Sequence, residues 1–168
     1  MTAPPDFTQV LAHLRDMSRP FPPTDLYHFS DLAPQELSRL AAAWPEAPVE
    51  RRRAIVSDLN DISEDNFEVD FEAFFRLGLA DEDGEVRSGS IRGLWESEDA
   101  GLIAPLLDFM QHDPAVQVRA AAATALGRFI YLGEIEELPA ARARRVEEAL
   151  LAVINGKDDL EVRRRALE

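Results

Sequence analysis

The sequence predicts an all-α protein, a right-handed α-solenoid of about four helix pairs with a short N-terminal cap. Two observations lead to this fold class. Apolar residues recur at helical spacing along most of the chain, and no segment shows the convincing alternating pattern of a strand. In addition, an acidic turn followed by a valine–arginine pair occurs several times, which indicates stacked repeats, because one helix pair cannot bury its own apolar stripe.

The repeat is anchored on three arginines, Arg87, Arg119 and Arg163, which follow one another at spacings of 32 and 44 residues. The seven residues that end at these arginines read DEDGEVR, DPAVQVR and KDDLEVR. We expect each arginine to reach an acidic turn of the adjacent repeat and to hold the stack together by charge-assisted hydrogen bonds. The predicted structural positions are Asp81, Val86, Arg87, Asp113, Val118, Arg119, Val162 and Arg163.

A fourth, weaker copy of the motif is PEAPVER, which ends at Arg51 and has its valine displaced by one position, at Val49. In the DPAVQVR copy, we expect Asp113 to cap the second helix and Pro114 to lie in its first turn. The unit is therefore a helix, a tight acidic turn and a second helix.

This pattern resembles the HEAT repeat family, in particular the variants named after phycobilisome-lyase HEAT-like repeats. The resemblance rests on D-x-x-x-x-V-R-x-x-A from Asp113 to Ala122 and on the matching segment from Asp81 to Ser90, whereas Lys157 replaces the aspartate in the last copy. It implies a scaffold or adaptor that holds other macromolecules. A minority of the family acts in bilin attachment, and related helical repeats include DNA-repair enzymes.

The expected organisation is an N-terminal helix with a proline-rich capping segment over residues 1–31 and HEAT-like repeats over residues 32–168. The repeats are placed at approximately 32–66, 67–97, 98–137 and 138–168. The aromatic segment Leu26–Phe29 is expected to cover the apolar end of the first repeat. Trp44 and Trp95 are expected to pack against neighbouring repeats.

Composition excludes some chemistry directly. The chain has no cysteine, which removes disulfides, thiol catalysis and thiolate zinc sites, and it shows no signal peptide or membrane-spanning run, which fits a cytoplasmic protein. The formal net charge is −14, and the stretch from Asp61 to Asp99 contains thirteen acidic and three basic residues. Nucleic acid and anionic membranes are therefore poor candidate ligands, because binding to phosphates depends on a basic surface.

No catalytic, cofactor or metal site emerges from the motifs. The histidines, His13, His28 and His112, have no second histidine at helical spacing, and the acidic runs lack the glycine and glutamate positions of a calcium loop. A glycine-rich phosphate loop and a serine elbow are also absent. We therefore expect no enzyme activity and no cofactor.

The leading functional hypothesis is a non-enzymatic protein-interaction scaffold that binds an extended or acidic peptide on the concave surface formed by the second helices. That surface is expected to be mildly basic, and the candidate partner-binding residues are Arg52, Ser88, Arg92, Ala120, Thr124 and Arg164, with Val56 beside them. The alternative is a bilin-lyase-like subunit acting on a chromophore protein, and a nucleic-acid-binding HEAT protein is disfavoured by charge.

The sequence ends five residues after Arg163, although the second helix of the preceding copy is expected to run ten residues beyond Arg119. We therefore expect that this chain is the N-terminal part of a longer repeat protein, or that its last two residues, Leu–Glu, are an appended pair. In either case the uncovered apolar face predicts weak end-to-end self-association and low stability after about residue 157. This face would comprise Leu150, Val153, Ile154 and Leu167.

Overall fold

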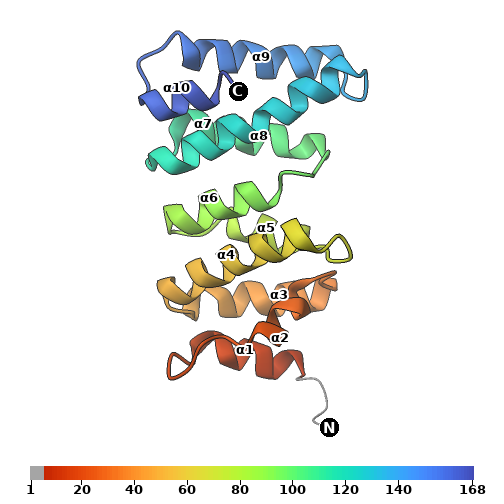
Figure 1. The fold of residues 1–168 in the computed structure, drawn as a ribbon, viewed down its shortest axis with the longest axis vertical. Coiled ribbons are helices and arrows are strands. Elements are labelled where there is room, and N and C mark those ends of the chain that lie inside the picture. The colour runs from red at the N-terminus through yellow and green to blue at the C-terminus, as the bar shows by residue number, and fades with distance from the viewer. Residues whose placement is uncertain (1–5) are drawn as a thin grey trace. The chain divides into compact units, whose positions relative to one another are not determined.

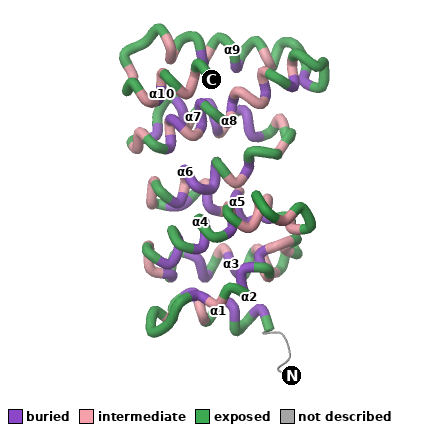
Figure 2. The backbone as a smooth tube through the Cα atoms, viewed as in Figure 1, coloured by how far each residue is buried: buried purple, intermediate pink, exposed green. Residues whose placement is uncertain are grey.

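The computed structural model of the protein describes residues 6–168, and all of its regular elements are helical (Figure 1). No strand occurs among these residues, so the all-α prediction is confirmed and the fold class is that of helical-repeat, α-solenoid proteins. The chain divides into two compact units, one reaching to Gly93 and one spanning Leu94–Glu168. Within each unit, most buried positions lie along the helices, where they alternate with exposed ones, and the connections are largely exposed (Figure 2).

In the N-terminal unit, helices that are separated in sequence pack against one another. Helix α1 packs on α3, α3 packs on α5, and α4 packs on both α2 and α6. The elements are α1 (Phe7–Arg15), α2 (Pro23–Leu26), η1 (Tyr27–Phe29), α3 (Pro34–Ala43), η2 (Trp44–Glu46), α4 (Val49–Asp65), α5 (Glu72–Gly78) and α6 (Gly84–Gly93).

An aromatic cluster forms the core of this unit. The ring of Phe74 lies 5.1 Å from the ring of Phe29 and 5.1 Å from that of Trp44, measured between centroids. Phe29 also stacks on Phe21 at 6.0 Å. The segment Leu26–Phe29 therefore contributes two buried side chains, Leu26 and Phe29, to this core and exposes Tyr27.

Two glycines of α6 allow this helix to approach α4 and α5 closely. A Cβ atom added at Gly89 of α6 would lie 2.5 Å from Cγ1 of Val56 on α4. A Cβ atom at Gly93 would overlap the ring of Phe75 on α5. At both positions a side chain would push the helices apart.

The C-terminal unit is built around α8, which packs on α7, α9 and α10. Helical spacing predicts that Val118, Ala122, Ala125 and Phe129 of α8 share one face; three of them are buried and Ala125 is half-buried. The elements are η3 (Ala100–Leu102), α7 (Ile103–His112), α8 (Val116–Glu134), α9 (Ala140–Ile154) and α10 (Leu160–Arg165).

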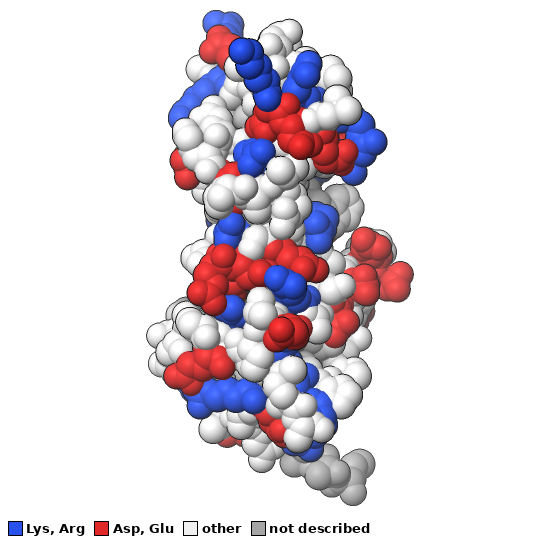
Figure 3. Space-filling view, turned by 90° about the vertical axis from the view of Figure 1, so that its left-hand side faces the viewer, with Lys and Arg blue, Asp and Glu red and all other residues white. Residues whose placement is uncertain are grey.

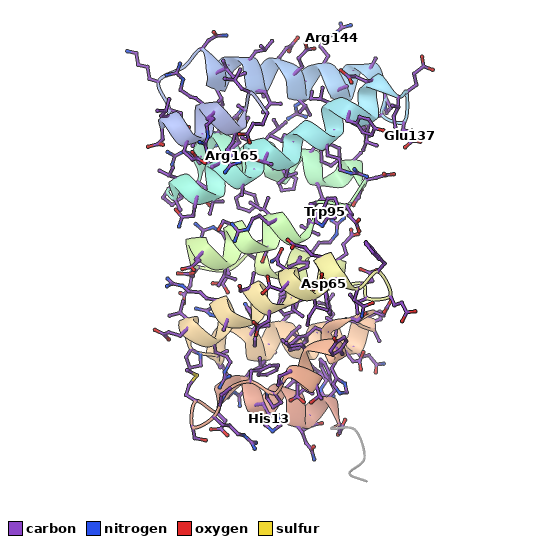
Figure 4. The ribbon with its side chains drawn as sticks, viewed as in Figure 1. His13, Asp65, Trp95, Glu137, Arg144 and Arg165 are labelled. Atoms are coloured by element: carbon purple, nitrogen blue, oxygen red, sulfur yellow. The ribbon has the colours of Figure 1, made fainter. Side chains whose placement is uncertain are left out.

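Three predictions about the C-terminal unit need correction. Helix α8 begins at Val116, so Pro114 lies outside it, and the carboxylate of Asp113 accepts the amide hydrogen of Ala115, the residue just before the helix. Leu150 is buried within the unit and is not part of an uncovered face, whereas Leu167 is exposed. Trp95 is 52% exposed and does not pack as a wedge, because α6 ends at Gly93 before reaching it (Figure 4).

Candidate functional site

The motif arginines make contacts that hold repeats together. In the C-terminal unit, Nη2 of Arg119 donates to Oδ1 of Asp158 at 2.8 Å, and Nη1 donates to the carbonyl of Asp113 at 2.9 Å. The first contact crosses from α8 to the turn before α10, which is the turn of the following repeat. The contact expected between a motif arginine and an adjacent acidic turn is therefore present here.

The N-terminal unit makes the same type of contact with different arginines. Arg52 pairs with the buried carboxylate of Asp81 at 3.2 Å, and Arg53 forms a two-pronged pair with Asp83 at 3.0 and 2.6 Å. Asp81 also accepts the indole hydrogen of Trp44 at 2.7 Å. The turn at residues 81–83 is thereby attached to α4, and acidic and basic side chains lie next to one another in this part of the N-terminal unit (Figure 3).

The other two motif arginines, Arg87 and Arg163, donate hydrogen bonds to main-chain carbonyls of their own repeat. Nη1 of Arg87 donates to the carbonyls of Asp81 and Glu82, both at 2.9 Å, and Nε of Arg163 donates to the carbonyl of Ile154 at 3.0 Å. These bonds close the turn that precedes each arginine. They support a structural role for this set of residues.

The six candidate partner-binding residues do not form one exposed surface. Arg52, Ser88 and Ala120 are buried, and so is Val56, so the prediction that they face solvent is wrong. Each of the first three residues comes one position after the arginine of its repeat, so this position faces the inside of the stack, and Arg52 there pairs with Asp81. Three of the six are exposed, namely Arg92 in the N-terminal unit and Thr124 and Arg164 in the C-terminal unit.

A different exposed surface stands out in the N-terminal unit. We call it the acidic face: the solvent side of the second half of α4 and the connection to α5. Its opposite side is fixed by Ile55 and Leu59, which are buried, and by Asn60, which donates to the carbonyl of Gly89 at 3.1 Å. The acidic face comprises Asp58, Asp61, Glu64, Asp65, Phe67 and Glu68, all exposed.

The carboxylates of the acidic face have no cationic partner in the part of the chain that the structure describes. None of them forms an ion pair within residues 6–168, and the sequence contains no lysine or arginine between Ala54 and Phe75. Partial desolvation, together with the negative charge of Asp61, raises the pKa of Asp58. The expectation of a mildly basic second-helix surface is therefore wrong for α4.

Phe67 projects from this surface and is 85% exposed. The connection that carries it is held at several points. The side chain of Asn66 accepts the amide hydrogen of Glu68 at 2.9 Å, and the main chain of Asp70 is hydrogen-bonded to Ser30 and Asp31 at 2.9 and 2.8 Å. Figure 4 marks Asp65 at the end of α4, where this connection begins. The exposed aromatic ring is therefore presented on a hydrogen-bonded segment.

Sequence patterns alone do not reveal the acidic face, because its carboxylates match no metal-binding or catalytic motif. Within the described part of the chain, no group of three or more histidine, aspartate or glutamate side chains is arranged to hold a metal ion. No helix among residues 6–168 combines the length and apolarity needed to cross a bilayer.

Comparison with known proteins identifies the repeats. A search of curated proteins and of solved structures gives no match. A family model described as HEAT repeats matches residues 72–168. This range starts at the first residue of α5 and includes all helices from α5 to α10. This match covers more than half of the chain and agrees with the paired helices and their valine–arginine turns. The chain therefore belongs to the HEAT repeat family.

Proposed function

We propose that this chain is a non-enzymatic protein-interaction module of the HEAT type, and that its acidic face binds a partner segment carrying basic and apolar side chains. The observation that carries the proposal is Phe67, which is 85% exposed beside carboxylates that have no cationic partner among residues 6–168. Helical repeats commonly present extended surfaces to other proteins.

The chemistry of this surface determines the kind of partner. Exposed aromatic side chains are frequent anchors of binding energy at protein interfaces, where they enter a pocket on the partner. Surrounding charges of one sign attract a partner of the opposite sign and fix its orientation. A segment with lysine or arginine residues around an apolar pocket would satisfy both requirements. A nucleic acid would be repelled, because its phosphates have the same sign as this surface.

An acidic peptide, the partner expected from the sequence, is disfavoured on the acidic face for the same reason. On the C-terminal unit, Arg164 is exposed but already lies 3.0 Å from the carboxylate of Glu161. Charge complementarity therefore favours a basic partner on the acidic face.

The proposal can be tested by affinity capture from the native host with three forms of the chain. The test variant carries Asp58→Asn, Asp61→Asn and Phe67→Ala. The control variant makes matched changes on α9, with Glu147→Gln, Glu148→Gln and Leu151→Ala, all at exposed positions. Quantitative mass spectrometry should show proteins that are retained by the wild type and the control but lost with the test variant.

The test variant should fold, because neutralising Asp58 and Asp61 removes like-charge repulsion and Phe67 makes little contact with the core. Circular dichroism and thermal unfolding check this point. An identical set of captured proteins for the test variant and the wild type would contradict the proposed site.

A further inference from the structure

A cavity of about 360 Å³, wide open to solvent, lies in the N-terminal unit at the start of α4, at the opposite end of this helix from the acidic face. It is lined by Met17–Pro20, in the connection from α1 to α2, and by Glu50, Arg51 and Ala54 of α4. Two arginines, Arg19 and Arg51, therefore contribute to its wall. Arg19 pairs with the carboxylate of Asp16 at 3.3 Å, whereas the surroundings of Arg51 differ from those of the structural arginines described above.

Arg51 is a buried cation that has no carboxylate partner among the described residues. It is 6% exposed, and no ion pair links it to any carboxylate within residues 6–168. Its Nη2 donates to the carbonyls of Asp16 and Arg19 at 2.5 and 2.7 Å, and its guanidinium lies 5.7 Å from the centre of the Phe21 ring. Its buried Nε has no acceptor.

These contacts do not neutralise the charge of Arg51. Carbonyl dipoles and an aromatic face supply only partial negative charge, whereas a buried cation is normally matched by a full negative charge. The neighbouring Arg52 shows the usual solution, since it pairs with Asp81. An anion in the cavity beside Arg51 would provide the missing charge.

Arg19, the second arginine of the wall, is held in place by a chain of hydrogen bonds. Nη2 of Arg19 lies 2.9 Å from Nε2 of His13, and Nδ1 of His13 lies 2.6 Å from Oδ2 of the buried Asp25. Because a guanidinium can only donate, Nε2 of His13 accepts and its Nδ1 carries the hydrogen that is donated to Asp25. The labelled His13 in Figure 4 lies on α1, beside this connection.

We propose that this cavity binds a carboxylate group carried by a peptide segment of a partner. A guanidinium suits a carboxylate because its planar fork can donate two parallel hydrogen bonds. Glu50 on the wall and the net charge of −14 favour an anion with a single charge over a phosphate with two. This site is separate from the acidic face and does not depend on the function proposed there.

Nuclear magnetic resonance of the full chain tests this site directly. The probes are sodium acetate, with sodium chloride at equal ionic strength as the reference, and a short aspartate-containing peptide amide, with its asparagine counterpart as the reference. We expect saturable chemical-shift changes of the amide resonances of Ser18 and Ala54 with acetate and with the aspartate peptide. We expect no such changes with sodium chloride or with the asparagine peptide. Binding of acetate without binding of the aspartate peptide would overturn the proposal, because the cavity would then admit only a free anion.

Three variants assign the binding to the cavity. Arg51→Gln should weaken acetate binding by about tenfold, the effect of losing a charged hydrogen bond. Arg51 also donates hydrogen bonds to two main-chain carbonyls, so Arg51→Gln can change the local structure as well as the charge. Arg19→Gln and Glu50→Gln therefore provide tests at more exposed positions. Arg19→Gln should weaken binding, and Glu50→Gln should strengthen it by removing a like charge.

The matched control is Arg53→Gln on the same helix, since Arg53 pairs with Asp83 and does not line the cavity. It should leave the affinity for acetate unchanged. Equal affinities in Glu50→Gln, Arg19→Gln and the wild type would overturn the assignment, whatever the behaviour of Arg51→Gln.

Discussion

Arg119 and Asp158 are 39 residues apart in the sequence, yet their side chains meet at 2.8 Å. Burial of Asp158 opposes its negative charge and raises its pKa. Three effects outweigh burial and lower the pKa of Asp158: the hydrogen bonds from Arg119, the hydrogen bond from the amide of Asp159, and the positive charge of Arg119. The folded state therefore favours the ionised carboxylate. This pair links the second helix of one repeat to the turn of the next.

We predict that Asp158→Asn lowers the free energy of unfolding by roughly 1–3 kcal/mol at neutral pH, because it weakens a charge-assisted hydrogen bond to a largely buried arginine. Since the pKa of Asp158 is lower in the folded chain, its stabilisation is complete above the pKa of the unfolded chain, which is about 3.9. It is lost as the pH falls through the lower folded-state pKa.

Urea unfolding measured from neutral to acidic pH checks this prediction. The curves of unfolding free energy against pH for the wild type and Asp158→Asn should converge in acid. Glu147→Gln, at an exposed position on α9, serves as the control and should follow the wild type throughout. A constant difference between Asp158→Asn and the wild type at all pH values would argue against the role of ionisation.

A second prediction concerns Asp81. Asp81→Ala would leave the buried Arg52 without one of its carboxylate partners and the indole of Trp44 without its acceptor. We expect a loss of about 3–5 kcal/mol in the free energy of unfolding, as for other broken buried ion pairs. Chemical unfolding followed by tryptophan fluorescence measures it.

The matched control for Asp81 is Glu82→Gln. Glu82 also contacts Arg52, at 2.9 Å, but its side chain is largely exposed. Exposed pairs contribute little, so the expected change is below about 1 kcal/mol. Equal losses of unfolding free energy for the two substitutions would show that the burial of Asp81 does not determine its contribution to stability.

A third prediction compares two glycines within helices. Gly89→Ala should be destabilising, because its Cβ would lie 2.5 Å from Val56 and separate α4 from α6. Gly127→Ala on α8 should be neutral or stabilising by up to about 1 kcal/mol, because nothing lies within 4 Å of its Cβ and alanine favours helix. Thermal unfolding of both variants tests this prediction. A double variant with Val56→Ala and Gly89→Ala is measured beside them, because it removes the side chain that the added Cβ would meet. Failure of the double variant to recover stability would argue against this steric explanation.

A fourth prediction is that hydrogen exchange is fast after about residue 157 and slow around Ala121–Leu126. Helix α10 spans only six residues and buries only Val162, whereas α8 buries Ala122, Ala123 and Leu126 in this short stretch. Mass spectrometry of exchanged peptides gives the comparison. Equal protection of α10 and α8 in a proven monomer would contradict it.

Much of the fold could be predicted because the repeat signal is local. The spacing of Val118, Ala122 and Phe129 on one helix face is set by the helical period, and the acidic turn before the valine–arginine pair marks where each second helix begins. These features do not depend on distant contacts.

The candidate surface was harder to predict because it depends on which side of each second helix is covered. Arg52 and Arg53 are adjacent in sequence, yet Arg52 is buried against Asp81 and Arg53 is exposed beside Asp83. A shift of one position reverses these environments, and the displaced Val49 left the register of this repeat open. The exposure of Phe67 likewise depends on hydrogen bonds between Asp70 and residues 30 and 31, which no local pattern reveals.

The most direct test of the central claim is the dissociation constant of a captured partner, measured by calorimetry at low and high salt for the wild type and Phe67→Ala. We predict that Phe67→Ala weakens binding by at least about tenfold, as expected for an anchoring aromatic residue, and that salt weakens binding of both forms. A dissociation constant that responds to neither the substitution nor the salt would contradict a partner site on the acidic face.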